Sequence, residues 1–180
     1  MSDLMQLVTH ALGGDTLESM SRQIGADTGS TAKAISAALP MLLGALDRNT
    51  NQAEGADALF NAVQKGHDGS ILDDLAGFLG GGQFDDGNAI LGHLLGGNRE
   101  PVENGISRAS GLDLSSVARL LPMLAPVVLG AIGKMQRQGC FDANGLSNAL
   151  SGELQRVAQA NPDSLSSLES LLEGNHEGQV

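Results

Sequence analysis

The residues best suited to chemistry lie in the segment HDGSILDD, where His67 is followed by Asp73 and Asp74. A histidine and two carboxylates can bind a metal ion or transfer protons. The segment lacks the H-E-x-x-H spacing that places two histidines on one face of a helix. We therefore interpret it as a turn followed by carboxylates at a helix start, and we keep an enzyme using these three residues as the third functional alternative.

Other reactive side chains form no recognisable catalytic pattern. Residues 47–58 begin with the spacing of a calcium loop, but Gln52 and Ala58 stand where such a loop requires Gly and Glu. Cys140 is the single cysteine, which excludes an internal disulfide. We expect no catalytic residues, no metal and no cofactor, and hence a protein that is not an enzyme.

The sharpest local pattern is that of a helix-turn-helix over residues 106–121, ISRASGLDLSSVARLL. Gly111 marks the turn, and apolar residues on either side have the spacing that holds two helices at a steep angle. Arg108 and Arg119 are the residues that would contact nucleic acid. Because the second helix carries one cation and continues into an apolar stretch, we interpret the motif as a packing unit and keep a DNA-associated regulator as the second alternative.

Two apolar stretches should supply most of the buried surface: AISAALPMLLGAL (34–46) and LLPMLAPVVLGAIG (120–133). The chain is 41% hydrophobic but has four Phe and no Tyr or Trp, so its core must be aliphatic, which favours closely packed helices. We predict an all-α fold, with Asp27 capping one helix and Gly25 ending the helix before it. Pro40 should either kink its helix after Leu39 or begin a new one.

The apolar stretches belong to a longer internal repeat. Aligned without gaps at an offset of 86, residues 20–48 and 106–134 are identical at 10 of 29 positions. We predict a multihelical array of two similar units, residues 1–85 and 86–160, packed as one domain. The glycine-rich segment 80–88 is expected to be a linker or mobile loop.

The net charge of the chain indicates which kinds of partner it would repel. A formal net charge of −11 repels phosphate backbones and anionic membranes. The N-terminus lacks the basic start of a secretory signal, and residues 120–133 are too short to span a bilayer. We expect a cytoplasmic protein without membrane insertion, with nucleic acid disfavoured as a partner.

Instead of nucleic acid or a membrane, we expect the protein to bind an unidentified protein partner or to self-associate. Residues 161–180 are predicted to form a C-terminal helix and an acidic tail. Leu165, Leu168 and Leu172 of that helix are candidate contacts, either with a partner or with the core of the protein.

The chain also resembles a known family. The paired segments ISRASGLDLSSVARLLPMLAPVVLGAIG and MSRQIGADTGSTAKAISAALPMLLGAL, with HDGSILDDLAGFLGGG and GHLLGG, resemble the bacterial YidB-like family, whose domain has no assigned function. The resemblance implies a small multihelical array with homeodomain-like three-helix packing in a soluble bacterial protein, and it supplies no catalytic residues. We therefore expect a non-enzymatic interaction or assembly module.

Overall fold

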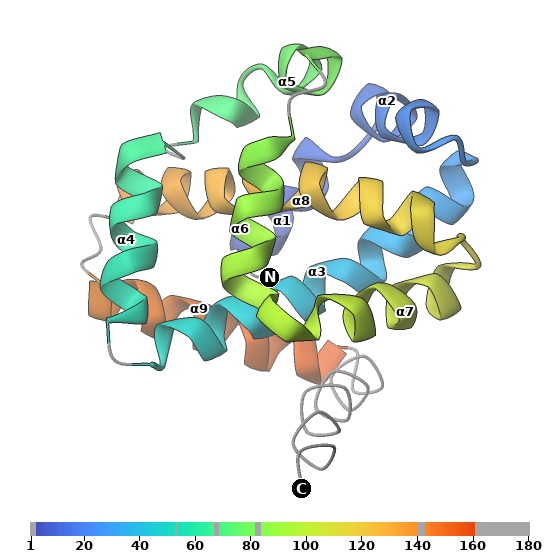
Figure 1. The fold of residues 1–180 in the computed structure, drawn as a ribbon. Helices are drawn as coiled ribbons and strands as arrows, with labels where there is room; N and C mark the ends of the chain where they lie inside the picture. Colours follow the sequence, from blue (N-terminus) through green and yellow to red (C-terminus); the bar gives the residue numbers. More distant parts are fainter. Residues whose placement is uncertain (1–2, 53, 67–68, 82–83, 140–142, 161–180) are drawn as a thin grey trace, which may run out of the picture.

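The computed structural model describes residues 3–52, 54–66, 69–81, 84–139 and 143–160. These residues form helices and turns without a strand among them, which confirms the predicted all-α fold. In chain order (Figure 1) the elements are α1 (Asp3–Ala11), α2 (Asp15–Ile24), α3 (Thr28–Thr50), α4 (Gly55–Gly66), the 3-10 helix η1 (Ser70–Leu72), α5 (Leu75–Gly81), α6 (Asp85–Leu95), the 3-10 helix η2 (Gly96–Asn98), α7 (Arg99–Ser110), α8 (Leu114–Gly139) and α9 (Ala143–Ala160).

Local sequence signals set the ends of the helices before the long apolar stretches. The Asp27 carboxylate accepts a hydrogen bond from the backbone N–H of Ser30 at 2.8 Å, so Asp27 caps α3 as predicted. Gly25 ends α2 with a φ of 72°, in the left-handed region that glycine adopts without a steric penalty. The predicted helix start and helix stop are therefore both confirmed.

Both long helices continue through their prolines. Pro40 lies inside α3, and Pro122 and Pro126 lie inside α8. Of the two outcomes expected at Pro40, the start of a new helix is wrong, because α3 runs from Thr28 to Thr50. All three prolines are buried, so packing against neighbouring helices maintains the helical backbone despite the missing N–H groups.

The glycine-rich segment 80–88 is not a long loop. Helix α5 extends to Gly81 and α6 begins at Asp85, so the expected linker is wrong for most of its length. Asp85 and Asp86 lie in the first turn of α6, where carboxylates favour the positive end of the helix dipole. This stabilisation, together with packing of α6 on α8, overrides the low helix propensity of the glycines.

The two long helices form the centre of the molecule, and each is covered by elements from both halves of the chain (Figure 1). Helix α3 packs against α7 and α9 as well as against α2 and α4. Helix α8 packs against α1, α2, α4 and η1 as well as against α6 and α7. The segments 1–85 and 86–160 therefore bury much of their apolar surface against one another.

The buried apolar side chains form a continuous cluster. Every residue from 120 to 133 is buried, as expected for a helix that is apolar on all sides. In the other stretch, 34–46, Ser36 is exposed and Ala37 is half-buried, so α3 has one side that reaches the surface.

The length of α3 and of α8 does not distinguish them from membrane-spanning helices. By length and composition α3 and α8 could each cross a membrane, but 67% and 89% of their most apolar windows are buried in the fold. The stretch 120–133 is part of a helix that continues through its prolines for 26 residues, so its length does not exclude a membrane span as we expected. Absence of membrane insertion stays a prediction, now based on burial.

Candidate interaction surfaces

Two turns, residues 25–27 and 111–113, form what we call the turn pair. Gly111 ends α7 with a φ of 79°, close to the 72° of Gly25. The two turns lie near one another, because Ser116 Oγ at the start of α8 is 3.2 Å from the Ile24 carbonyl oxygen at the end of α2. The turn pair therefore brings the end of α2 close to the start of α8.

The acidic residues of the turn pair are used for capping. The pKa of Asp27 is lowered chiefly by the hydrogen bond from the Ser30 N–H. The pKa of Asp113 is lowered chiefly by the hydroxyl of Ser115 and then by that of Ser116, each of which donates at 2.6 Å. Both carboxylates are therefore stabilised in the charged form.

The cations around the turn pair are exposed. Arg108 lies in the last turn of α7 and Arg119 in the second turn of α8, and both side chains are open to solvent. Leu114, at the first position of α8, is 46% exposed, more than any other large apolar residue among those described. From residue 120 to residue 133, however, α8 is buried, so near the turn pair only its first turn and a half can touch a partner.

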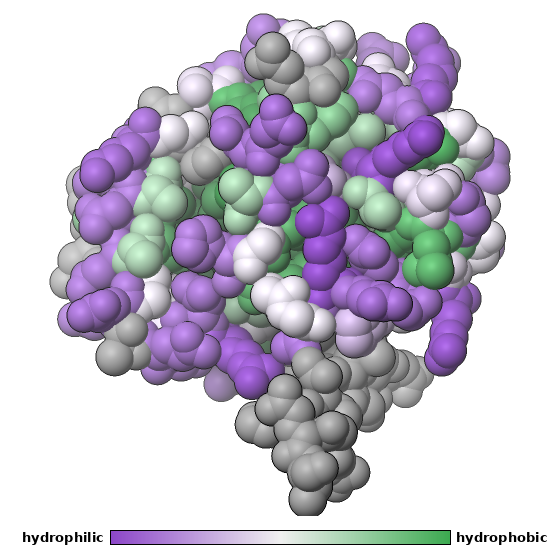
Figure 2. All heavy atoms as spheres, in the orientation of Figure 1, coloured by the Kyte–Doolittle hydropathy of each residue, from purple (hydrophilic) through white to green (hydrophobic). Residues whose placement is uncertain are grey.

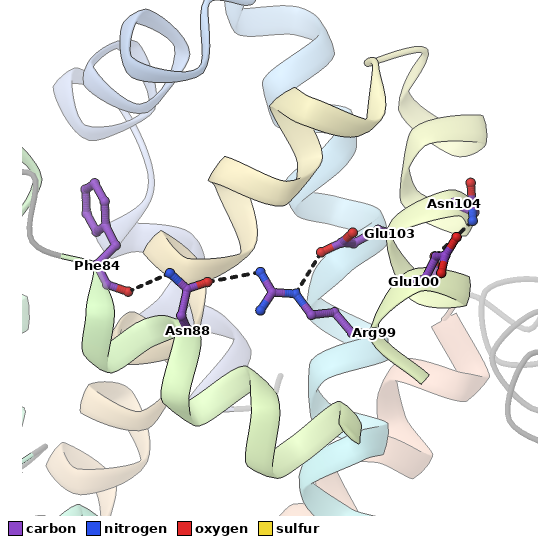
Figure 3. Close-up of polar contacts among 6 residues, drawn as sticks. All are labelled: Phe84, Asn88, Arg99, Glu100, Glu103 and Asn104. Atoms are coloured by element: carbon purple, nitrogen blue, oxygen red, sulfur yellow. Dashed lines mark hydrogen bonds and ion pairs between the residues drawn. The ribbon is translucent and has the colours of Figure 1, made fainter. Parts of the chain in front are cut away.

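A polar network that the sequence did not predict ties α6 to α7 (Figure 3). Arg99 Nε donates to Glu103 Oε1 at 2.9 Å, and Arg99 Nη2 donates to Asn88 Oδ1 at 3.0 Å. Asn88 Nδ2 in turn donates to the Phe84 carbonyl oxygen at 3.3 Å. The i,i+4 spacing of Arg99 and Glu103 could have revealed the ion pair, whereas the link to Asn88 requires the fold.

Of the three residues that the enzyme alternative would use, His67 lies outside the described residues. Asp73 and Asp74 are both exposed, and Asp74 Oδ1 accepts from the Gly77 N–H at 3.0 Å, a capping role at the start of α5. The described part of the chain also contains no group of three or more His, Cys, Asp or Glu arranged to hold a metal ion.

The candidate contacts Leu165, Leu168 and Leu172 lie outside the described residues. A different apolar stripe, on α9, contacts the core: Leu146, Leu150 and Val157 are buried at the spacing i, i+4 and i+11. The contacts predicted from the sequence lie in the tail alone, so this stripe was missed, although its helical spacing is visible in the sequence.

We call the surface beneath this stripe the α9 seat. It is formed by α3 and α4, with Leu4 of α1 and Ile132 and Met135 of α8 at one end. Its polar edge lies on α3, where Asp47 accepts a hydrogen bond from the Ser151 hydroxyl and the Ser147 hydroxyl lies 3.5 Å from that of Thr50. Helix α9 is thus held by an apolar stripe with hydroxyl contacts beside it.

The surface around these elements is mostly hydrophilic. Figure 2 shows one face of the molecule, on which hydrophilic residues dominate and smaller apolar areas are visible between them. Such a surface is typical of a helical array whose apolar residues are directed inward.

The fold places the chain among small multihelical arrays. Residues 6–135 match the family described as bacterial protein of unknown function (DUF937), and the chain belongs to this family. Comparison with curated proteins and with solved structures gives no match. The family match ends within α8, so the whole of α9 lies beyond it.

Proposed function

We propose that this protein is a non-enzymatic interaction or assembly module, built from two YidB-like units with helix-turn-helix-like packing. The observation that best supports this function is the α9 seat. An amphipathic helix lying in a groove is a recurring mode of protein recognition, and here the groove is formed largely by residues within the family match. In this proposal the protein acts in the cytoplasm and does not insert into membranes.

The similar turns support the predicted duplication. Gly25 and Gly111 have nearly equal φ values, and Asp27 and Asp113 occupy equivalent positions before α3 and α8. Two units of this kind, each contributing a long apolar helix to the core, support a protein that acts by binding other proteins and not by catalysis.

Light scattering tests the proposal on the full chain and on a chain ending at residue 160. We expect a concentration-dependent mass above that of the monomer in the full chain, with a change on removal of residues 161–180 if Leu165, Leu168 and Leu172 take part. A monomer of unchanged mass in both proteins at every concentration would contradict self-association and leave only a foreign partner.

A DNA-associated regulator is the alternative, supported by the exposure of Arg108 and Arg119 beside the turn pair. In residues 20–35 and 106–121 four cations accompany two acids, although the whole chain carries −11. Fluorescence anisotropy with duplex DNA at ~50 mM salt should then detect binding that falls with added salt and with the double variant R108A/R119A. Absence of binding under these conditions would exclude this alternative.

A further inference from the structure

Three exposed cations lie at one end of the molecule, which is formed by the start of α3, the end of α7 and the start of α8 (Figure 1). They are Lys33, Arg108 and Arg119, and none of them forms an ion pair within the described part of the chain. Leu114, the most exposed large apolar residue among those described, lies at the same end, at the first position of α8. We call these four residues the cationic end.

The cationic end differs from other charged parts of the molecule. Arg22 and Arg99 each form an ion pair with a glutamate four residues away on the same helix. Acidic residues outnumber Lys and Arg by 21 to 10 in the whole chain, yet the three cations of the cationic end have no acidic partner among the described residues. Exposed cations beside an exposed leucine favour a partner surface that carries both carboxylates and apolar side chains.

The same chain has such a surface on α6. Residues 69–98 contain four Asp and neither Lys nor Arg. Asp85 and Asp86 are exposed in the first turn of α6, and Ile90 and Leu94, both half-buried, follow Asp86 at the spacing i+4 and i+8. This spacing places Asp86 and the two apolar residues on one side of the helix. We call Asp85, Asp86, Ile90 and Leu94 the α6 face.

The nearest cation along the chain does not neutralise the α6 face. Arg99 donates hydrogen bonds to Glu103 and to Asn88. Asn88 lies two residues before Ile90, which is about 160° away around a helix of about 3.6 residues per turn. Arg99 is therefore bound on the opposite side of α6. Because α6 lies in front of α8 (Figure 1), it forms part of the surface that Figure 2 displays.

We propose that the cationic end of one molecule binds the α6 face of a second copy of this chain, so that copies associate head to tail. The inference rests on the proposed function as an assembly module and names its partner. In this contact the cations face Asp85 and Asp86, and Leu114 packs beside Ile90 and Leu94. No ion pair joins the two surfaces within the described part of one chain, so both are open to a second molecule.

The charge of the whole molecule favours this orientation over others. Each copy carries a net charge of −11, so most orientations bring acidic surfaces together and are repelled. The cationic end and the α6 face instead bring opposite charges together, which directs the two copies into this contact. Because the charges are exposed, added salt should weaken the association by shortening the Debye length from about 10 Å at 0.1 M to about 3 Å at 1 M.

The first test reverses the charge of each surface in the full-length chain. R108E/R119E makes the cationic end negative, and D85K/D86K makes the α6 face positive. Each variant alone then opposes like charges, so light scattering should give an association constant at least about tenfold below that of the unmodified chain. An equimolar mixture should recover association, because each reversed surface meets its complement on the other variant. Circular dichroism checks that both variants keep their helix content.

The matched control is R48E/K65E, which reverses two exposed cations outside the cationic end and gives the same net charge as R108E/R119E. This control should associate as the unmodified chain does. Equal association of R108E/R119E and the control would overturn the proposal, as would a mixture of the two reversed variants that stays as weak as each alone. An unmodified chain that remains monomeric would also overturn it, but would leave the broader interaction function open to foreign partners.

The second test does not depend on charge reversal, and it applies even where a reversed variant fails to fold. Leu114→Ser changes a side chain that is 46% exposed, so the fold should be retained. Loss of its apolar contact with the second copy should weaken association by about fivefold. Association that is unchanged in this variant would contradict the contact.

The same variants distinguish a second copy from nucleic acid at the cationic end. Fluorescence anisotropy with duplex DNA at ~50 mM salt measures the competing interaction, because phosphate contacts are strongest at low salt. We expect R108E/R119E to lose self-association whether or not the unmodified chain binds DNA. Loss of DNA binding with self-association retained would assign the cationic end to nucleic acid and overturn the proposal.

Discussion

The α-carbon of Gly87 in α6 lies directly against the backbone carbonyl of Pro122 in α8. A Cβ added to Gly87 would stand 2.0 Å from the Pro122 oxygen and 2.8 Å from its carbonyl carbon. Within α8 that carbonyl would normally accept from the N–H of residue 126, but residue 126 is proline and has no N–H. The freed carbonyl is therefore covered by a glycine of the neighbouring helix, an arrangement typical of close helix contacts with Cα–H···O geometry.

The substitution Gly87→Ala should consequently destabilise the protein by about 1–3 kcal/mol, because a backbone carbonyl cannot move aside as a flexible side chain can. Urea unfolding followed by circular dichroism measures the change. The matched control is Gly92→Ala in the same helix, where an added Cβ meets nothing within 4 Å. That control should stabilise α6 by about 0.5–1 kcal/mol through helix propensity. Equal effects of the two substitutions would contradict the close contact.

The turn pair gives a second prediction. Gly25 and Gly111 have φ values of 72° and 79°, and a Cβ at either position would meet nothing within 4 Å. Gly25→Ala and Gly111→Ala should therefore each cost about 1–2 kcal/mol, from backbone conformation alone. Asparagine at the same positions should cost less, because Asn tolerates the left-handed region. Thermal unfolding of the four variants checks this order, and a large difference between the two alanine variants would contradict the equivalence of the turns.

Much of this fold could be predicted from local residue patterns. The cap at Asp27, the stop at Gly25 and the burial of residues 120–133 follow from short-range rules on capping and amphipathicity. The continuation of α3 through Pro40 and of α6 through Gly87 could not, because in both cases packing against distant segments overrides local propensity. These contacts join residues that are far apart in the chain, and the spacing of apolar residues within one helix does not predict such contacts.

Less could be predicted from the sequence about the candidate surfaces than about the fold. Arg108 and Arg119 were identified from the helix-turn-helix pattern, and the structure places both on the surface. The α9 seat was missed because it is assembled from α1, α3, α4 and α8, no one of which shows a groove by itself. Only the stripe of α9 was visible in the sequence, and its spacing matches that of an ordinary core helix.

The interlocked packing predicts that neither half of the chain folds alone. Residues 1–85 lack α7 and α9, which cover α3, and residues 86–160 lack α1, α2 and η1, which cover part of α8. Each fragment should therefore show much less helix than its share of the full chain, and mixing the two should restore helix content by circular dichroism. A cooperative thermal transition in either fragment alone would show that the units are independent domains.

The capping aspartates predict a specific dependence of stability on pH. The pKa values of Asp27 and Asp113 are lowered in the folded protein by hydrogen bonds that favour the carboxylate. A lowered pKa means that the folded state binds the proton less tightly than the unfolded state, so these residues contribute stability above the unfolded pKa of about 3.9. That contribution is lost as the pH falls from this value through the folded pKa. The double variant D27A/D113A should therefore be less stable than the unmodified chain at neutral pH, and the difference should shrink below about pH 4. Urea unfolding of both proteins across this range measures the difference, and a deficit that stays constant with pH would mean that the carboxylates stabilise the two helices by some means other than their charge.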